Sequence, residues 1–313
     1  MTNLIGSSDV GYLLYSVLPL DWMWSLSRFH GRLTYLVSPG RRSVVRRNLA
    51  SAGGGKTSAE LDALTRQFFE FKRLRGLLLA LAPRLSSEQL AKLLPLEGLE
   101  HLDAALERNQ GVILLGSHLN SLCLFPATIS LRGLGYDVRT ALPEPEDPWR
   151  PTWLRRMLDR TLDTQPVSEL IGAFYAQFNI RPIVRLLADN AVVTQTGDGL
   201  HSARFVDVDF LGRKIPFPTG MASVAQLTGA VVVPVFQVGA LPDRMRVLIE
   251  EPWTVAREEV EEGALQNSVA AYAKRLEHHL LENLACWEHW LIEDTLATIA
   301  TWPQKPLTER YAV

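Results

Sequence analysis

The sequence predicts an α/β protein with a single mixed, mostly parallel sheet flanked by helices, preceded by a helical amino-terminal extension. Short apolar runs separated by helical stretches begin near residue 111, a pattern typical of alternating strands and helices. The residues before that point show helical patterns, and no linker long enough to separate two domains follows them. We therefore expect an extension over residues 1–95, an α/β core over residues 96–292 and a carboxy-terminal tail over residues 293–313.

Composition and charge narrow the class of protein. The chain has 313 residues, of which 47% are hydrophobic and 21% are charged, so it can bury a sizeable core and is not a disordered chain. Its 32 basic and 34 acidic residues give a formal net charge of -2, which leaves no overall cationic field for binding nucleic acid. Two cysteines favour a reducing compartment over a secreted fold held by disulfides.

The amino-terminal segment is apolar but interrupted. Residues 10–26 are rich in Leu, Trp, Tyr and Val, with Pro19 and Asp21 among them, and they follow no secretory pattern. A carboxylate argues against a membrane span, whereas a helix lying in the membrane interface tolerates it. A cationic cluster follows, formed by Arg28, Arg32, Arg41, Arg42, Arg46 and Arg47. The pairing predicts a peripheral protein on an anionic membrane surface, and the alternative is a core helix followed by a solvated arginine face.

The remaining elements follow in order along the chain. Ser58 is the expected N-cap of a helix over residues 59–82, and shorter helices are expected over residues 87–94 and 99–107. Strands are expected over residues 112–115, 138–142, 191–196, 204–210, 231–236 and 245–249. Helices between and after them are expected over residues 120–134, 151–162, 180–188, 220–227 and 257–284.

The most informative stretch is GVILLGSHLNSLCLF, residues 111–125. A buried strand ends there in Gly116 and Ser117 and delivers His118 at the start of a helix, and strand ends are where open α/β sheets present chemistry. A neutral imidazole can take a proton from an alcohol near pH 7, and the backbone N–H groups from Gly116 to Asn120 could hold a developing oxyanion. A structural or merely exposed histidine is the alternative.

This stretch resembles the lipid A biosynthesis acyltransferase family, the lauroyl and myristoyl acyltransferases, within the lysophospholipid acyltransferase superfamily. The family signature is His, four residues, then Asp or Glu. An early basic block with a following Asn-Leu is similar to residues 41–49, and a Gly-Leu-Glu lead matches residues 98–100. A later block resembles residues 191–236, where the matching residues are Asp198, Phe210, Gly212, Phe217, Gly220, Ala222, Ala225, Thr228, Gly229, Ala230 and Pro234. The resemblance runs from about residue 10 to about residue 292.

One position departs from the family signature, because Cys123 stands where the family has its carboxylate. That carboxylate is understood to orient the histidine and to stabilise the imidazolium, a role that an uncharged thiol performs poorly. Three interpretations stay open. Asp198 replaces the carboxylate; or Cys123 is a packing residue in a site without chemistry; or Cys123 is a nucleophile that accepts the acyl chain with His118 as its base.

The resemblance implies a glycerolipid acyltransferase-like fold and an enzyme without a cofactor. Such an enzyme moves a fatty acyl group from a thioester, on acyl carrier protein or coenzyme A, to a hydroxyl or amine of a lipid or glycolipid-like acceptor. His118 would be the general base, with Asp198 beside it and Gly116, Ser117 and Asn120 around the oxyanion. The expected location is the cytoplasmic face of the bacterial inner membrane. A lipid or acyl-carrier binding protein without activity is the alternative.

Two further groups of residues are candidate sites. Arg139, Arg150, Arg155 and Arg156 cluster after the second strand, where the family uses arginines near anionic substrates, and a solvated helix face explains them equally well. On one continuous helix His278, Glu282, Cys286 and His289 would share a face. No second cluster completes that set, and no Gly-rich phosphate loop is present, so we expect no metal ion and no nucleotide cofactor.

Overall fold

We describe the protein from a computed structural model. It describes residues 19–82, 85–120, 123–142, 161–162, 165–176, 179–200, 202, 204–256, 263–292 and 294–301. The first part of the predicted apolar segment, up to residue 18, therefore lies outside the described residues. So do residues 151–160 of the helix predicted over 151–162, whereas residues 161–162 form a short strand rather than the end of a helix.

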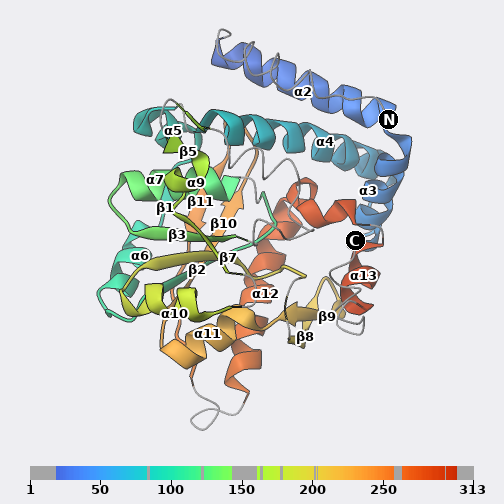
Figure 1. The fold of residues 1–313 in the computed structure, drawn as a ribbon. Coiled ribbons are helices and arrows are strands. Elements are labelled where there is room, and N and C mark those ends of the chain that lie inside the picture. The colour runs from blue at the N-terminus through green and yellow to red at the C-terminus, as the bar shows by residue number, and fades with distance from the viewer. Residues whose placement is uncertain are drawn as a thin grey trace.

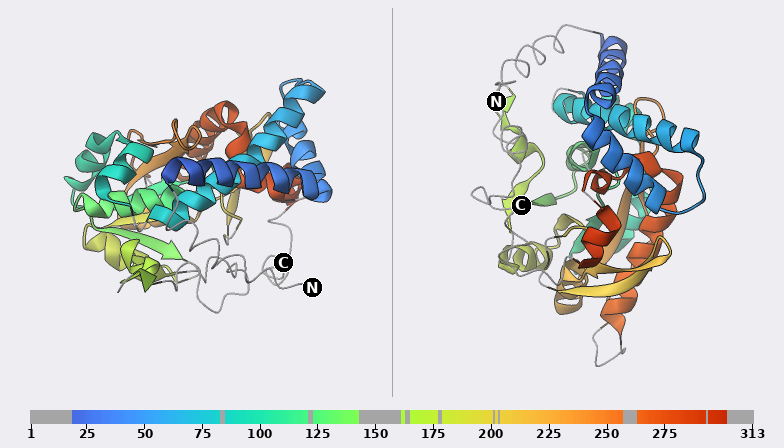
Figure 2. Two further views of the ribbon diagram at one scale, coloured as in Figure 1. Left: turned by 90° about the horizontal axis from the view of Figure 1, so that it is seen from above. Right: turned by 90° about the vertical axis from the view of Figure 1, so that its right-hand side faces the viewer.

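The described part of the amino-terminal third is helical, with α2 (Leu20–Val37), α3 (Pro39–Ser51), α4 (Ser58–Leu81), α5 (Ser87–Leu93) and α6 (Leu99–Leu106). α2 lies across the outside of the molecule along α4 (Figures 1 and 2). The two helices approach closely at Gly31, where an added Cβ would lie 2.6 Å from the Cα of Glu70. The helix α4 begins one residue earlier than predicted, because the hydroxyl of Thr57 accepts from the backbone N of Glu60 and is the N-cap in place of Ser58.

The sheet has seven strands in the order β1-β11-β10-β2-β7-β3-β6. The strands are β1 (Leu96–Glu97), β2 (Val112–Gly116), β3 (Val138–Leu142), β6 (Ala173–Tyr175), β7 (Val192–Thr196), β10 (Val231–Val238) and β11 (Arg246–Ile249). Every neighbouring pair among them is parallel except β10 and β11. The predicted fold class, a mixed and mostly parallel sheet with flanking helices, is confirmed.

Helices cover both faces of this sheet (Figure 1). On one face lie α10 (Arg181–Ala188), α11 (Gly220–Thr228) and α12 (Ala264–Glu282), and on the other lie α6, α7 (Leu124–Gly133) and the second half of α4. Side chains of β2 alternate between the two cores, with Ile113 in the first and Leu114 in the second. The central strand is therefore buried on both faces, as its continuous apolar run predicts.

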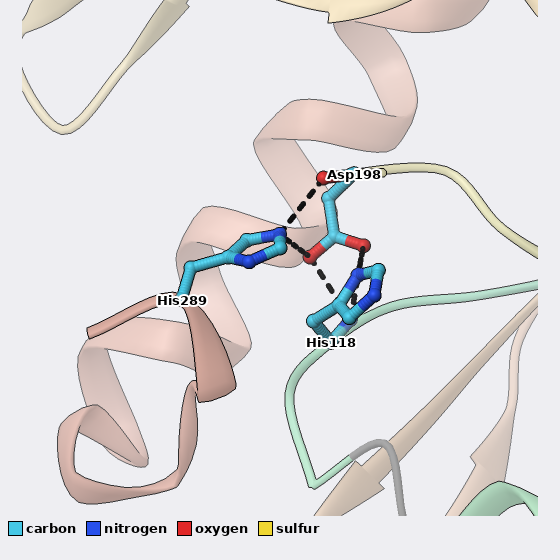
Figure 3. A group of neighbouring side chains, drawn as sticks. All are labelled: His118, Asp198 and His289. Carbon is cyan, nitrogen blue, oxygen red and sulfur yellow. Dashed lines mark hydrogen bonds and ion pairs between the residues drawn. The ribbon is translucent and has the colours of Figure 1, made fainter. Parts of the chain in front are cut away.

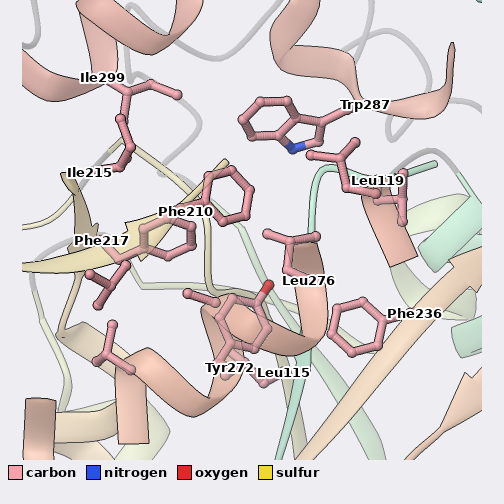
Figure 4. Packing of buried hydrophobic residues seen from close by; sticks show 14 of the residues in the cluster. Leu115, Leu119, Phe210, Ile215, Phe217, Phe236, Tyr272, Leu276, Trp287 and Ile299 are labelled. Carbon is pink, nitrogen blue, oxygen red and sulfur yellow. The ribbon is translucent and has the colours of Figure 1, made fainter. Parts of the chain in front are cut away.

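The strand predicted over residues 204–210 does not join the sheet. It forms β8 (Phe205–Phe210) of a separate hairpin with β9 (Arg213–Pro218), a strand that the sequence did not predict. Leu211 and Gly212 make the turn at φ 52° and 70°. Phe210 and Phe217 of this hairpin pack toward Tyr272 of α12 and toward Trp287 (Figure 4). A second two-stranded ribbon, β4 (Thr161–Leu162) with β5 (Gln165–Pro166), precedes the short helix α9 (Val167–Leu170).

The chain after α12 folds back over the sheet edge. The helix predicted over residues 257–284 ends at Glu282, and the single turns η3 (Leu284–Cys286) and η4 (Glu288–Leu291) follow before α13 (Thr295–Thr301). We call residues 284–291 the strap. The side-chain amide of Asn48 in α3 donates to the carbonyl oxygens of Trp290 at 2.9 Å and Ile292 at 2.7 Å, so the amino-terminal helices hold the strap in place.

Among the described helices, none combines the length and the apolar character that crossing a bilayer requires.

Candidate active site

Two neighbouring parallel strands bring His118 and Asp198 together. β2 and β7 pair in register up to Gly116 and Thr196, and each chain then turns away at the same edge of the sheet. His118 follows β2, and Asp198 follows β7 after Gly197. Two side chains that lie 80 positions apart in the sequence therefore face each other at the mouth of the sheet (Figure 3).

The carboxylate of Asp198 binds the turn that carries His118 at several points. Its Oδ1 lies 2.8 Å from Nδ1 of His118, and the backbone N of His118 donates to both carboxylate oxygens at 2.9 Å. The indole Nε1 of Trp287 donates to Oδ2, also at 2.9 Å. Because Nδ1 of His118 is engaged by an acceptor, the lone pair of the neutral ring is on Nε2. The His118 side chain is 30% exposed, whereas that of Asp198 is 2% exposed.

Burial and charge act in opposite directions on this dyad. Burial would raise the pKa of Asp198, but the charge of His118 and the N–H donors around the carboxylate hold that pKa well below its usual range. Burial would likewise lower the pKa of His118, and the adjoining Asp198 carboxylate outweighs it and raises that pKa. The structure thus contains an ionised carboxylate behind an imidazole, the arrangement that stabilises an imidazolium.

His289 of the strap is the third member of the cluster in Figure 3. Its Nε2 lies 2.9 Å from the backbone oxygen of Asp198, and its ring centroid lies 4.3 Å from that of His118. Burial, and then the charge of His118, lower the pKa of His289 to about 4. The sequence pointed to His289 only as a metal candidate, since nothing in its spacing indicates that a strap after the last long helix reaches His118.

Asn120 is part of a buried clasp behind the turn. It has a positive φ of 51°, its backbone N donates to the oxygen of Cys286 at 2.9 Å, and its side-chain oxygen accepts from Nη1 of Arg75 at 2.9 Å. The other terminal nitrogen of Arg75 donates to Glu288 at 2.8 Å, and Lys72 donates to the same carboxylate at 2.6 Å. Asn120 is completely buried, so its side chain does not reach solvent, and its contacts fix the shape of the turn.

Three of the backbone amides expected to hold the oxyanion form hydrogen bonds within the protein. The N–H of His118 donates to Asp198, that of Leu119 to the hydroxyl of Ser117 at 3.2 Å, and that of Asn120 to Cys286. Each of these donors is already used within the protein, which leaves none of them for a substrate oxygen in this arrangement. The Ser117 side chain is buried, and the oxygen of Gly116 accepts from Tyr272 at 2.5 Å.

Cys123 lies in the core and not on the surface of the site. Its side chain is fully buried in the cluster that contains Leu114 and Ala127. Burial first of all raises the pKa of its thiol to about 12, against the lowering effect of Arg75. A protonated, enclosed thiol is a poor nucleophile, so the structure favours a packing role at this position.

Of the four predicted arginines, the described residues include only Arg139, which does not lie at the dyad. Nε of Arg139 pairs with Asp137 at 2.6 Å, and Arg139 lies opposite Val193, near the start of the strands rather than at the edge where they end. Arg150, Arg155 and Arg156 lie outside the described residues.

Two groups of the described residues have side chains of the kinds that ligate metal ions. In the first, His118, Asp198 and His289, the carboxylate oxygens already accept hydrogen bonds from the protein. The second, His278, His279 and Glu282, is largely exposed on α12. The predicted face of His278, Glu282, Cys286 and His289 does not form, because the helix ends at Glu282 and the strap carries Cys286 and His289 elsewhere.

A small apolar pocket lies beside the dyad. Its space is only about 10 Å³, room for about one water molecule, between Asp198, the β8–β9 hairpin, Trp287 of the strap and Ile299 of α13. Its lining is Asp198, Gly199, Leu200, Phe210, Ile215, Pro216, Phe217, Pro218, Trp287 and Ile299. Apart from Asp198 these are apolar side chains or glycine, so the pocket is apolar, and it is too small for an alkyl chain unless its walls move apart.

Comparison with known proteins identifies the family of the chain. A family model, bacterial lipid A biosynthesis acyltransferase, matches residues 10–291 of the chain. A search of individually curated proteins found no match. The matched region includes both strands that carry the dyad, the hairpin and the whole strap. The chain therefore belongs to the bacterial lipid A biosynthesis acyltransferase family, whose members transfer acyl groups in lipid A synthesis.

Proposed function

We propose that the chain transfers a fatty acyl group from an acyl thioester, on acyl carrier protein or coenzyme A, to a hydroxyl or amine of a lipid or glycolipid-like acceptor, with His118 as general base. One observation carries the proposal: Nδ1 of a partly exposed His118 is held at 2.8 Å by the buried carboxylate of Asp198. The second ring nitrogen is then the one available to an acceptor hydroxyl.

The reaction is a single displacement. Nε2 of His118 takes the proton of the acceptor hydroxyl as its oxygen attacks the thioester carbonyl carbon, which gives a tetrahedral intermediate. The carbon–sulfur bond then breaks, and the leaving thiolate takes the proton back from His118. Asp198 keeps its negative charge throughout, so that it orients the ring and stabilises the imidazolium while that cation exists. An ester and a free thiol are the products.

Asp198 performs in this proposal the role that the family signature gives to the residue at position 123. The geometry supports this, because Asp198 is ionised, buried and bonded to both the ring and the backbone of His118. It also supports a working enzyme over the alternative of a binding protein that has lost its carboxylate.

Substrate placement follows from the surroundings of the dyad. We place the alkyl chain of the donor beside Asp198, between the β8–β9 hairpin and Trp287. These walls must move apart to admit it, because the space between them holds only about one water molecule. A chain bound there would bring the thioester carbonyl to His118. The lipid acceptor reaches the site from an anionic membrane surface, against which α2 lies with its exposed apolar side chains: Trp22, Leu26, Phe29, Leu33, Leu36 and Val37. We place the protein at the cytoplasmic face of the bacterial inner membrane for this reason.

Mass spectrometry of lipid extracts tests the proposal. Purified protein is incubated with the extract and with acyl carrier protein or coenzyme A thioesters, and wild type is compared with His118→Ala. The matched control is His101→Ala, which removes a partly exposed histidine from α6. A new acylated lipid is expected from wild type and control, and none from His118→Ala.

Two results would contradict the proposal. Equal product from His118→Ala would remove His118 as the base. No product from any sample, in an extract that an active member of the family does acylate, would favour the lipid or acyl-carrier binding protein instead.

A further inference from the structure

His289 touches both members of the dyad, yet the proposed reaction gives it no proton to carry. Its Nε2 lies 2.9 Å from the backbone oxygen of Asp198. Its ring centroid lies 4.3 Å from that of His118, with the two planes inclined by 31°. The side chain is 9% exposed, so it is a wall of the site and not a surface residue.

The contact with a carbonyl oxygen determines the form of the ring. That oxygen only accepts, so Nε2 of His289 carries the hydrogen and donates it. With its pKa lowered to about 4 by burial and by the charge of His118, His289 is neutral around pH 7. It therefore fixes the Asp198 turn without placing a second cation against the imidazolium of His118.

Hydrogen bonds from residues outside the strap hold the backbone around His289 in place. The hydroxyl of Thr295 donates to the oxygen of His289 at 2.7 Å, and the amide of Asn48 in α3 donates to the oxygen of Trp290 at 2.9 Å. Trp287 packs edge-on against His289, with ring centroids 4.9 Å apart, and binds the Asp198 carboxylate as well. The ring thus has support on one side and the dyad on the other.

We propose that His289 is a positioning residue of the acyl-transfer site, which holds the Asp198 turn through its Nε2–H and keeps the His118 ring aligned on the carboxylate by packing against it. The inference rests on the proposed function for its kinetic consequence, and its structural part stands without it. Besides Asp198, the charged group that acts on His118 is Glu288 of the strap, and His289 faces it as a neutral ring.

Two substitutions separate the two contacts. His289→Phe keeps a ring against His118 and removes the donor, whereas His289→Gln keeps a donor and removes the ring. The matched control is His279→Phe, since His279 is also buried, bonds Glu250 at 2.6 Å and lies 4.6 Å from the ring of Phe236 without contacting the dyad.

The expected result is a loss of kcat in His289→Phe of about 10-fold to 100-fold with KM little changed, because misalignment acts on the reacting groups and not on substrate binding. The acid limb of its pH profile moves to lower pH, because a loosened Asp198 stabilises the imidazolium less. His289→Gln, which keeps the donor without the ring, loses less kcat than His289→Phe but does not reach wild type, and His279→Phe keeps wild-type kcat and pH profile. Unchanged kcat and pH profile in His289→Phe, or equal losses in the control, would overturn the positioning role.

A measurement on the unaltered protein decides the matter if a variant does not fold. Nitrogen-15 NMR of the imidazoles is expected to show His289 as the neutral Nε2–H form from pH 8 down to about pH 5.5, and neutral His118 as the Nδ1–H form. A His289 that titrates near the ordinary histidine pKa of about 6.5, or that carries its hydrogen on Nδ1, contradicts the inference. The NMR measurement needs no substrate, so it tests the role of His289 independently of the proposed function. Failure of the proposed function would instead appear as a wild-type protein without acyltransferase activity.

Discussion

A single carboxylate, that of Asp198, collects the hydrogen bonds that define the site. It accepts hydrogen bonds from the ring and the backbone of His118 and from the indole of Trp287. The main-chain oxygen of Asp198 accepts a further hydrogen bond from His289. At the residue scale the site therefore depends on one ionised oxygen pair that burial alone would have made neutral.

Replacing Asp198 by asparagine tests its role. The uncharged amide of Asp198→Asn would neither stabilise the imidazolium nor fix the ring form, so kcat is expected to fall by about 10²-fold to 10⁴-fold. Wild-type activity should drop as pH falls through the pKa of His118, which is raised above its usual value of about 6.5. In the variant this drop should occur at a lower pH. Rates measured from pH 5 to pH 9 check this, with the exposed Asp207→Asn of β8 as control. Full activity in Asp198→Asn would contradict the assignment.

The same carboxylate links folding stability to pH. Its pKa in the folded protein lies below the unfolded value of about 3.9, so its contribution is present above that pH and is lost as pH falls toward the folded pKa. The free energy of unfolding, measured with urea, is expected to fall more steeply between pH 5 and pH 3 for wild type than for Asp198→Asn. Parallel curves for the two proteins would show that folding does not lower the pKa of Asp198.

The thiol of Cys123 is expected to be dispensable for chemistry. Cys123→Ala should keep activity within a few-fold and lose about 1 kcal/mol of stability, since only a small buried group is removed. Intact-protein mass spectrometry of wild type quenched during turnover should show no acyl adduct. An adduct that disappears in Cys123→Ala would restore the nucleophile interpretation.

At the scale of elements, α2 has two apolar faces. One face packs against the protein, and the other is exposed to solvent. Met23 and Trp24 are buried, whereas Trp22 is 69% and Phe29 62% exposed. Seen from above, α2 lies on the outside of the molecule (Figure 2). The open stripe repeats at the spacing of a helix and ends beside the arginines of α3, as expected of an interfacial helix.

Membrane binding is therefore expected to depend on the open face of α2. The double variant Trp22→Ser, Phe29→Ser should lose at least about tenfold in affinity for vesicles containing anionic lipid, because it removes apolar area that the membrane would cover. Flotation measures this, with Leu227→Ser of α11, 62% exposed, as control. Equal flotation of the double variant and wild type would remove α2 as the docking element.

At the scale of the whole molecule, a buried ion pair joins the amino-terminal helices to the strap. Arg75 of α4 is 1% exposed and meets Glu288 at 2.8 Å, while Asn120 of the turn after β2 accepts from the same guanidinium. Burial would raise the pKa of Glu288, but Arg75 and Lys72 lower it to about 2. The amino-terminal helices and the turn that carries His118 thus share one electrostatic clasp.

Breaking this clasp is expected to destabilise the fold. Glu288→Gln leaves the buried guanidinium of Arg75 without its counter-charge and should cost about 3 kcal/mol. The exposed pair of Glu282 with His278 offers the control, since Glu282→Gln should change stability by no more than about 0.5 kcal/mol. Urea titration at pH 7 measures the unfolding midpoint of each variant. A midpoint of Glu288→Gln equal to that of wild type would show that the ion pair contributes little to stability.

Much of the fold could be predicted from the sequence, and both members of the dyad could be named from it, Asp198 as one of three open interpretations of Cys123. The apolar run before His118 predicts a buried strand with that residue at its end, and the order of apolar runs predicts the parallel sheet. Both are local: a strand or helix shows in the periodicity of its own residues, because burial of one face imposes that period. The family resemblance, confirmed over residues 10–291, is likewise a property of residue order.

The contacts of Asp198 were decided only by the tertiary structure. The sequence offered Asp198 as one of three interpretations of Cys123, and it named neither Trp287 nor the positioning contact of His289. It ended the last long helix at residue 284, two residues late, and did not predict the two single turns of the strap. Periodicity reports which residues are buried but not against what, whereas a hydrogen bond across 80 or 91 positions depends on where whole elements come to rest. Strand position and His118 therefore follow from the sequence, and its partners follow from packing.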